Sequence, residues 1–97
     1  MKEKDIESWC KKHARKQGWW VRKFTSPGHR SAPDDIFAKT GHVFFTEFKA
    51  TGVEPTELQK SEHGNMEAAG LVVWVCDSRE KFEAILAFEE EMRARKI

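Results

Sequence analysis

The sequence predicts an α/β domain with its elements in the order α-β-β-β-α-β-α and a mixed four-stranded sheet flanked by helices. Three patterns support this fold class: an amphipathic N-terminal stretch, two alternating segments joined by a tight turn, and a short apolar segment after a second helix. The first three strands can run as a meander, and the fourth returns through a helical crossover. Because the chain has 97 residues, 39% of them hydrophobic, we expect a single domain over residues 1–97.

The N-terminal third predicts a helix, a strand and a loop. Apolar residues recur at helical spacing over residues 3–17, and a glycine follows as a natural stop. Residues 19–24 are rich in aromatic and β-branched side chains, which favours a strand. Trp19 and Trp20 alternate on it, so one is expected in the core, and the other is a candidate for base stacking or for an interface. Residues 25–32 contain Ser-Pro-Gly and predict a loop.

The middle of the chain predicts a hairpin followed by a helix and a strand. Residues 34–39 and 43–50 have strand character around a tight Thr-Gly-His turn. A helix that starts at Pro55 is expected to end at Gly70 as its C-cap. Residues 71–76 are apolar throughout, which predicts a central strand covered by helices on both faces.

A last helix is predicted to begin with Asp77 and Glu80 as a capping pair. Its charged C-terminal part, residues 89–96, is expected to be solvated. Of the histidines, His42 is expected in the turn of the hairpin and His63 at the surface.

Composition excludes several classes of protein. The longest apolar run, residues 71–76, is far shorter than the roughly 20 residues of a membrane span, and the N-terminus is charged rather than a signal peptide. We therefore expect an intracellular protein of bacterial or phage-infected cytoplasm, not secreted and without a membrane partner. Cys10 and Cys76 lie 66 positions apart in apolar surroundings, which favours buried free thiols over a disulfide.

The net charge of +1 conceals a strong asymmetry along the chain. Residues 1–30 carry nine Lys/Arg against three Asp/Glu, whereas residues 31–97 carry eight against thirteen. The cations of the first segment could follow a phosphate backbone, although solvated helix faces would give the same pattern. They are Lys2, Lys4, Lys11, Lys12, Arg15, Lys16, Arg22, Lys23 and Arg30.

Glu47 and Lys49 share one face of their predicted strand with Val43 and Phe45, because side chains alternate along a strand. Two charges on an apolar face are costly unless they are paired or bind something, so the pattern predicts a half-buried functional pocket. A surface ion pair is the alternative for an isolated Glu-x-Lys. Asp34 stands 13 residues upstream of Glu47, and a short hairpin would bring it alongside.

These side chains suit a hard divalent cation. Mg²⁺ or Mn²⁺ binds carboxylate and carbonyl oxygens and keeps several waters, so Asp34, Glu47 and the backbone carbonyl of Phe48 could supply three ligands. Such an ion polarises a phosphate oxygen and lowers the pKa of water, while Lys49 orients that water or stabilises charge in the transition state.

Asp34 and its neighbour Asp35 are both candidates for the second carboxylate, and alternation sends them to opposite faces of the strand. We favour Asp34, because Ile36 and Ala38 share its side and would form the floor of the pocket. Asp35 is then expected to face solvent.

The ordered set of motifs resembles the VRR-NUC domain, a branch of the PD-(D/E)xK nuclease superfamily with a restriction-endonuclease-like core. The resemblance implies that Asp34 and Glu47 bind the divalent ion, that Lys49 completes the catalytic site and that Gln59 supports it. It also implies a contribution of Glu7 to the metal site, either directly or through water. The matching pieces are Glu7, residues 31–34 (Ser-Ala-Pro-Asp), residues 47–49 (Glu-Phe-Lys) and Gln59, within residues 7–76.

One departure from the family pattern concerns the loop before Asp34. The family usually has a glycine shortly before its Pro-Asp, whereas this chain has Ser31-Ala32. The loop that carries His29 and Arg30 is therefore expected to have a different shape.

The function expected from these residues is metal-dependent, structure-selective cleavage of DNA, because so small a chain can recognise only backbone and shape. Stand-alone members of the family it resembles are associated with homodimers and with four-way (Holliday) junctions, which suggests a homodimer acting on branched or duplex DNA. The alternatives are a non-catalytic nucleic-acid-binding module and a subunit of a larger phage or bacterial assembly. Candidate substrate contacts are Arg30, His29, Lys23 and Arg22.

Overall fold

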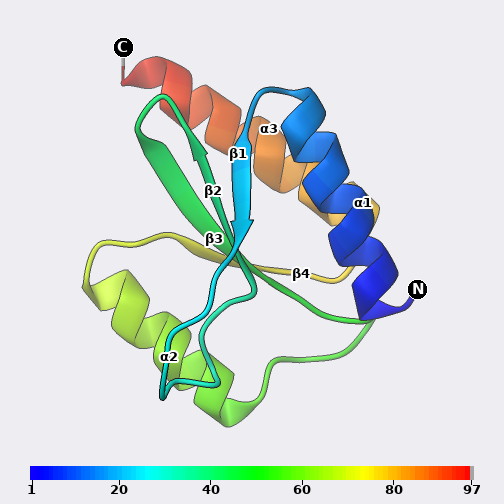
Figure 1. Ribbon diagram of the computed structural model, residues 1–97, viewed down its shortest axis with the longest axis vertical. Coiled ribbons are helices and arrows are strands. Elements are labelled where there is room, and N and C mark those ends of the chain that lie inside the picture. Colours follow the sequence, from blue (N-terminus) through cyan, green and yellow to red (C-terminus); the bar gives the residue numbers. More distant parts are fainter. Residues whose placement is uncertain (97) are drawn as a thin grey trace.

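The computed structural model describes residues 1–96 and confirms the predicted α/β class and element order. Figure 1 shows a twisted sheet with α1 and α3 on one side and α2 set apart from both. The elements are α1 (Glu3–Lys16), β1 (Trp20–Lys23), β2 (Asp35–Lys39), β3 (His42–Phe48), α2 (Glu57–Ala68), β4 (Val73–Cys76) and α3 (Arg79–Arg95).

The four strands lie in the order β1-β2-β3-β4, with antiparallel pairs up to β3 and a parallel pair between β3 and β4. This arrangement is the predicted meander followed by a crossover through α2. The prediction that residues 71–76 form a central strand is wrong, because β4 pairs only with β3 and is an edge strand. Leu71 and Val72 are accordingly exposed.

The β2–β3 hairpin sets the register of the site described below. Its two-residue turn consists of Thr40 (φ 46°) and Gly41 (φ 82°), both in the left-handed region that a turn of this kind requires. His42 is therefore the first residue of β3, paired with Lys39, and it is buried rather than part of the turn.

The two faces of the sheet differ in what covers them. The face that packs against α1 and α3, which we call the α1/α3 face, carries the main hydrophobic core. The opposite face, which we call the α2 face, is covered by α2 only over β3 and β4. Core residues on the α1/α3 side are Ile6, Cys10, Ala14, Trp19, Val21, Phe37, Phe44, Phe48, Cys76, Phe82, Ile85 and Leu86.

Both later helices begin with a side-chain cap. Thr56 caps α2 in a capping box with Gln59, so the helix begins just after the predicted Pro55. At α3 the cap is Ser78, whose hydroxyl accepts the Lys81 N–H at 3.1 Å, and the predicted pair of Asp77 with Glu80 is wrong. Asp77 instead accepts the Gly52 N–H at 2.9 Å, which ties the β3–α2 loop to the end of β4.

Three further expectations concern burial. Cys10 and Cys76 are buried free thiols, and Trp19 is 3% exposed while Trp20 is 49% exposed, as predicted. The expectation that residues 89–96 are solvated is wrong for Glu89, which is 1% exposed. Within residues 1–96, no helix combines the length and the apolar composition that a bilayer-spanning segment needs.

Candidate active site

Asp34 and Glu47 lie opposite each other across the β2–β3 hairpin. Asp35 pairs with Thr46, so one step along the antiparallel register places Asp34 opposite Glu47. Alternation puts both side chains on the α2 face. The hairpin thus brings together the two carboxylates that were predicted to share a site.

Backbone and side-chain contacts fix each of these carboxylates. Asp34 Oδ2 accepts the backbone N–H of Phe48 at 2.7 Å, which holds Asp34 beside the end of β3. Glu47 is 3% exposed, and its Oε2 accepts the side-chain amide of Gln59 at 3.3 Å. The other oxygen of Glu47, Oε1, is buried without a hydrogen-bond partner.

The electrostatics of Glu47 follow from this environment. Burial is the largest cause that raises the pKa of Glu47, the negative charge of Asp34 raises it further, and the result is a value of about 8. The positive charge of Lys49 acts in the opposite direction. Burial and the second carboxylate both disfavour the ionised form of Glu47. A cation bound beside it would stabilise that ionised form.

Gln59 connects the site to the start of α2. Its Oε1 accepts the Thr56 N–H at 2.9 Å within the capping box, while its Nε2 donates to Glu47. The same side chain therefore caps a helix and orients a buried carboxylate.

His63 belongs to this cluster, which corrects the expectation that it lies at the surface. It is 7% exposed, and its Nε2 lies 3.6 Å from Glu47 Oε1. Burial lowers the pKa of His63, so the neutral imidazole is favoured. The spacing from Gln59 to His63 is four residues, one helical turn, and this spacing could have indicated that both face Glu47.

Asp35 and Glu7 occupy the opposite, α1/α3 side of the sheet. Asp35 is fully buried, which corrects the expectation of a solvent-facing residue, and Lys11 Nζ lies 3.1 Å from its Oδ1. Burial raises the pKa of Asp35 to about 7, and the neighbouring Glu7 contributes. Burial alone would raise the pKa of Glu7, but hydrogen bonds with Asp35 and Lys23 lower it, so Asp35 is the partner that keeps a proton.

The predicted substrate contacts divide into two groups. His29, Arg30 and Lys23 line a hollow of about 270 Å³ together with Asp34, so the β1–β2 loop borders the site. Lys23 also forms an ion pair with Glu7 at 3.2 Å. Arg22 does not line this hollow. Its side chain lies farther along the α2 face, with the guanidinium over the ring of Trp20.

The residues present fit a divalent cation held by few protein ligands. Within residues 1–96 no group of three His, Cys, Asp or Glu side chains is arranged to hold a metal ion. Mg²⁺ commonly takes only one or two protein carboxylates and keeps its remaining waters. Asp34 and Glu47 meet that requirement, and the unpartnered Glu47 Oε1 is an oxygen available to such an ion.

Comparison with known proteins places this chain among the nucleases. A relative that is 40% identical over 81 residues, covering 82% of this chain and 87% of its own length, is “Putative nuclease p44” of Acyrthosiphon pisum secondary endosymbiont phage 1. A solved structure described as a VRR_NUC domain superposes with a TM-score of 0.81 at 25% identity, covering 88% of this chain and 94% of that one.

No family model matches the chain. The relative and the solved structure nevertheless agree, and the chain belongs to the VRR-NUC family of nucleases.

Proposed function

We propose that this protein is a Mg²⁺- or Mn²⁺-dependent endonuclease that hydrolyses DNA phosphodiesters at Asp34, Glu47 and Lys49. The observation that supports the proposal most strongly is the opposition of Asp34 and Glu47 on one face of the sheet, with a buried oxygen of Glu47 left without a partner. A buried carboxylate next to a second carboxylate is unfavourable without a cation, and the hairpin holds Glu47 of β3 opposite Asp34, the residue just before β2.

The proposed ligands are Asp34, Glu47 and the backbone carbonyl of Phe48. When bound, the ion would withdraw charge from a phosphate oxygen and make water a better nucleophile at neutral pH. Asp34 is already fixed by the Phe48 N–H at 2.7 Å, so little reorganisation is required to bind a cation there.

Lys49 and Gln59 have separate tasks in this proposal. Lys49 lies two residues after Glu47, just beyond the end of β3, and its positive charge favours the ionised form of Glu47. Its ammonium group would orient the attacking water or stabilise charge on the phosphate while the leaving oxygen departs. Gln59 keeps one Glu47 oxygen in place, which leaves the other free to bind the cation.

Glu7 supports the site from the opposite side of the sheet. Its hydrogen bond to Lys23 at 3.2 Å places the Lys23 ammonium at the border of the hollow next to Asp34. Any contact between Glu7 and the metal would pass through water. The contacts of Glu7 favour a role in positioning Lys23.

The substrate class follows from the charge on α1. A hollow of about 280 Å³ is lined mainly by cations, with Glu7 and Ser8 among them, and this composition suits a phosphate backbone. Branched DNA such as a four-way junction, cut by a homodimer, agrees with a chain that offers one site and reads shape rather than sequence. The cations are Lys4, Lys11, Lys12, Arg15 and Lys23.

The test is cleavage of duplex, flap and four-way DNA in Mg²⁺ or Mn²⁺, with the oligomeric mass measured alongside. Lys49→Ala should reduce the rate by about 100-fold or more, as is typical when a preorganised charge is removed from an active site. Lys96→Ala, which alters an exposed lysine at the end of α3, is the matched control. Cleavage by Lys49→Ala at the parent rate would refute the proposed chemistry.

Calorimetry with Mn²⁺ separates the enzyme from the two alternative functions. We expect binding to the parent and weakened binding to Glu47→Gln. A folded protein that retards DNA but binds no Mn²⁺ would instead be a non-catalytic binding module. A protein that neither binds Mn²⁺ nor retards DNA would fit a subunit of a larger assembly.

A further inference from the structure

The α2 face has an uncovered end. Trp20 pairs with Ala38, and Ala38 pairs with Val43, so these three residues form one row across β1, β2 and β3. Trp20 is 49% exposed and Val43 is 38% exposed. Because α2 lies at the other end of the sheet, this row remains open to solvent (Figure 1).

Arg22 adds a cation to this apolar row. It follows Trp20 by two residues on the same face of the edge strand, and its guanidinium carbon lies 4.8 Å from the centre of the Trp20 ring. Its Nη1 donates to the Val21 carbonyl at 2.8 Å, which fixes the guanidinium near the ring. An exposed aromatic ring beside a positioned cation offers stacking for a base and charge for its phosphate.

The row is continuous with the candidate active site on the same face. Ala38, next to Trp20, is four residues along β2 from Asp34, which corresponds to about 13 Å at the rise of a β-strand. Arg22 pairs with Ile36 and therefore lies midway between the two positions. At roughly 3.4 Å per nucleotide of a stacked strand, the interval spans about four nucleotides.

We propose that Trp20 and Arg22 form a platform that binds an unpaired strand of the DNA substrate about four nucleotides from the cleaved phosphate. The proposal rests on the proposed nuclease function and names the part of the substrate that this face recognises. Nucleic acid is the favoured occupant because the platform carries a cation, shares its face with Asp34 and Glu47, and lies on the edge strand next to the cationic hollow of α1. It would make unpaired DNA beside the cut a determinant of selectivity.

Binding measured without cleavage tests the platform independently of the nuclease chemistry. A short fluorescein-labelled single-stranded oligonucleotide is titrated in EDTA with parent, Trp20→Ala and Trp20→Phe. Trp20→Ala should weaken binding about 5- to 150-fold, the range expected for the loss of one stacked base, while Trp20→Phe retains most of the affinity. Arg22→Ala should weaken binding and reduce its salt dependence, because one phosphate contact is lost.

Phe88→Ala is the matched control, because Phe88 is also 49% exposed but lies on α3, away from the α2 face. It should bind the oligonucleotide like the parent. Thermal melting of every variant verifies folding. Equal affinity of folded Trp20→Ala and parent would overturn the platform, even if Lys49→Ala had abolished cleavage.

Oligomeric mass and cleavage kinetics complete the test. If Trp20→Ala converts a dimer to a monomer and leaves the oligonucleotide affinity unchanged, the face binds a second copy of the chain and the proposal is wrong. In cleavage, shortening the unpaired strand beside the cut below about four nucleotides should raise KM for the parent and have little effect on KM for Trp20→Ala.

Discussion

Two glutamates, Glu47 on β3 and Glu89 on α3, are buried to nearly the same degree and differ in how their oxygens are used. Glu89 is 1% exposed, its Oε1 lies 2.5 Å from His42 Nε2, and its Oε2 accepts the Trp74 indole N–H at 3.0 Å. Glu47 is 3% exposed, has one hydrogen bond from Gln59, and faces a second carboxylate.

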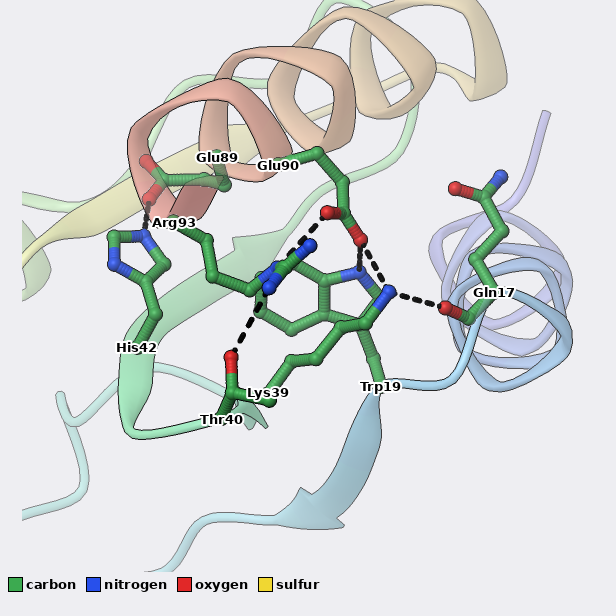
Figure 2. Close-up of polar contacts among 8 residues, drawn as sticks. All are labelled: Gln17, Trp19, Lys39, Thr40, His42, Glu89, Glu90 and Arg93. Atoms are coloured by element: carbon green, nitrogen blue, oxygen red, sulfur yellow. Dashed lines mark hydrogen bonds and ion pairs between the residues drawn. The ribbon is translucent and has the colours of Figure 1, made fainter. Parts of the chain in front are cut away.

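The neighbour of Glu89 shows the same full use of its oxygens. Figure 2 shows Glu90 between Trp19, Lys39 and Arg93, with Glu89 and His42 beside them. Glu90 Oε1 accepts from Lys39 Nζ at 2.7 Å and from the Trp19 indole at 3.0 Å, and its Oε2 accepts from Arg93 Nε at 3.0 Å. This cluster, formed by Glu89, Glu90 and their partners, ties α3 to the segment just before β1 and to the β2–β3 hairpin.

Glu89 and Glu47 represent two kinds of buried carboxylate, one that stabilises the fold and one that can bind a cation. A buried carboxylate whose oxygens all meet donors stabilises the fold, and its removal leaves those donors unpaired. A buried carboxylate with an unpartnered oxygen next to a like charge lowers stability unless a cation binds. Glu89 belongs to the first kind and Glu47 to the second.

The largest contrast is expected from changing each glutamate to glutamine. Glu47→Gln should reduce cleavage by about 100- to 1,000-fold, because it removes the negative charge of a proposed metal ligand, while the melting temperature without metal stays the same or rises. Glu89→Gln should leave cleavage by the folded protein unchanged and lower the melting temperature. Rates on one DNA substrate and thermal melts of both variants provide the measurement, and an inactive, well-folded Glu89→Gln would contradict the division.

Removing the Glu89 side chain entirely tests the structural half of the comparison. Glu89→Ala should lower the free energy of unfolding by about 3–5 kcal/mol, because His42 and Trp74 lose a buried partner. Urea denaturation measures the loss. A cycle with His42→Ala should show that the two losses are not additive, since they remove one shared contact. A loss within the range of an ordinary surface substitution would show that Glu89 does not hold α3 in place.

The order of elements and the opposition of Asp34 and Glu47 could be predicted because both depend on local patterns. Strand alternation and a short turn decide which residues face each other in a hairpin. The turn is Thr40 and Gly41 alone, one residue shorter than the predicted Thr-Gly-His turn, and this register sets Asp34 opposite Glu47. The same reasoning separated Trp20 from Trp19. These features need no knowledge of distant contacts.

The features that the sequence did not predict depend on partners far along the chain. Glu89 is buried against His42, which lies 47 residues away in the sequence. The charged residues next to Glu89 in the sequence indicate only a solvated helix end. Residues 71–76 are apolar enough for a central strand, but β4 pairs with β3 alone and therefore lies at the sheet edge. The sequence of this segment does not specify that pairing. His63 is an intermediate case, because its spacing from Gln59 was visible in the sequence.

Gln59 has two roles, one in the capping box of α2 and one beside Glu47, and two variants can separate them. Gln59→Ala should reduce cleavage about 10- to 100-fold, the usual effect of removing a group that orients a metal ligand. Thr56→Ala removes the other half of the capping box and should lower stability by about 1 kcal/mol with cleavage retained, because the contact between Gln59 and Glu47 remains. Equal losses of cleavage in both variants would mean that Gln59 acts only through the helix.

A further effect is expected in the pH dependence of stability without metal. Unfolding returns the pKa of Glu47 from about 8 toward 4.5, so the unfolded chain releases this proton at lower pH than the folded protein. Stability should therefore decline as pH rises from about 4.5 to about 8. Asp35, whose pKa is raised to about 7, contributes a parallel decline.

Thermal melts across this pH range, in EDTA and in Mg²⁺, distinguish the two carboxyl groups. Mg²⁺ should restore stability at the alkaline end in the parent and much less in Glu47→Gln, because only an ionised Glu47 attracts the cation. Asp35→Asn should reduce the metal-free decline and leave the Mg²⁺ effect intact, because Asp35 lies on the other face of the sheet. If Mg²⁺ stabilises Glu47→Gln as strongly as the parent, the ion binds elsewhere, and Glu47 is a structural residue like Glu89.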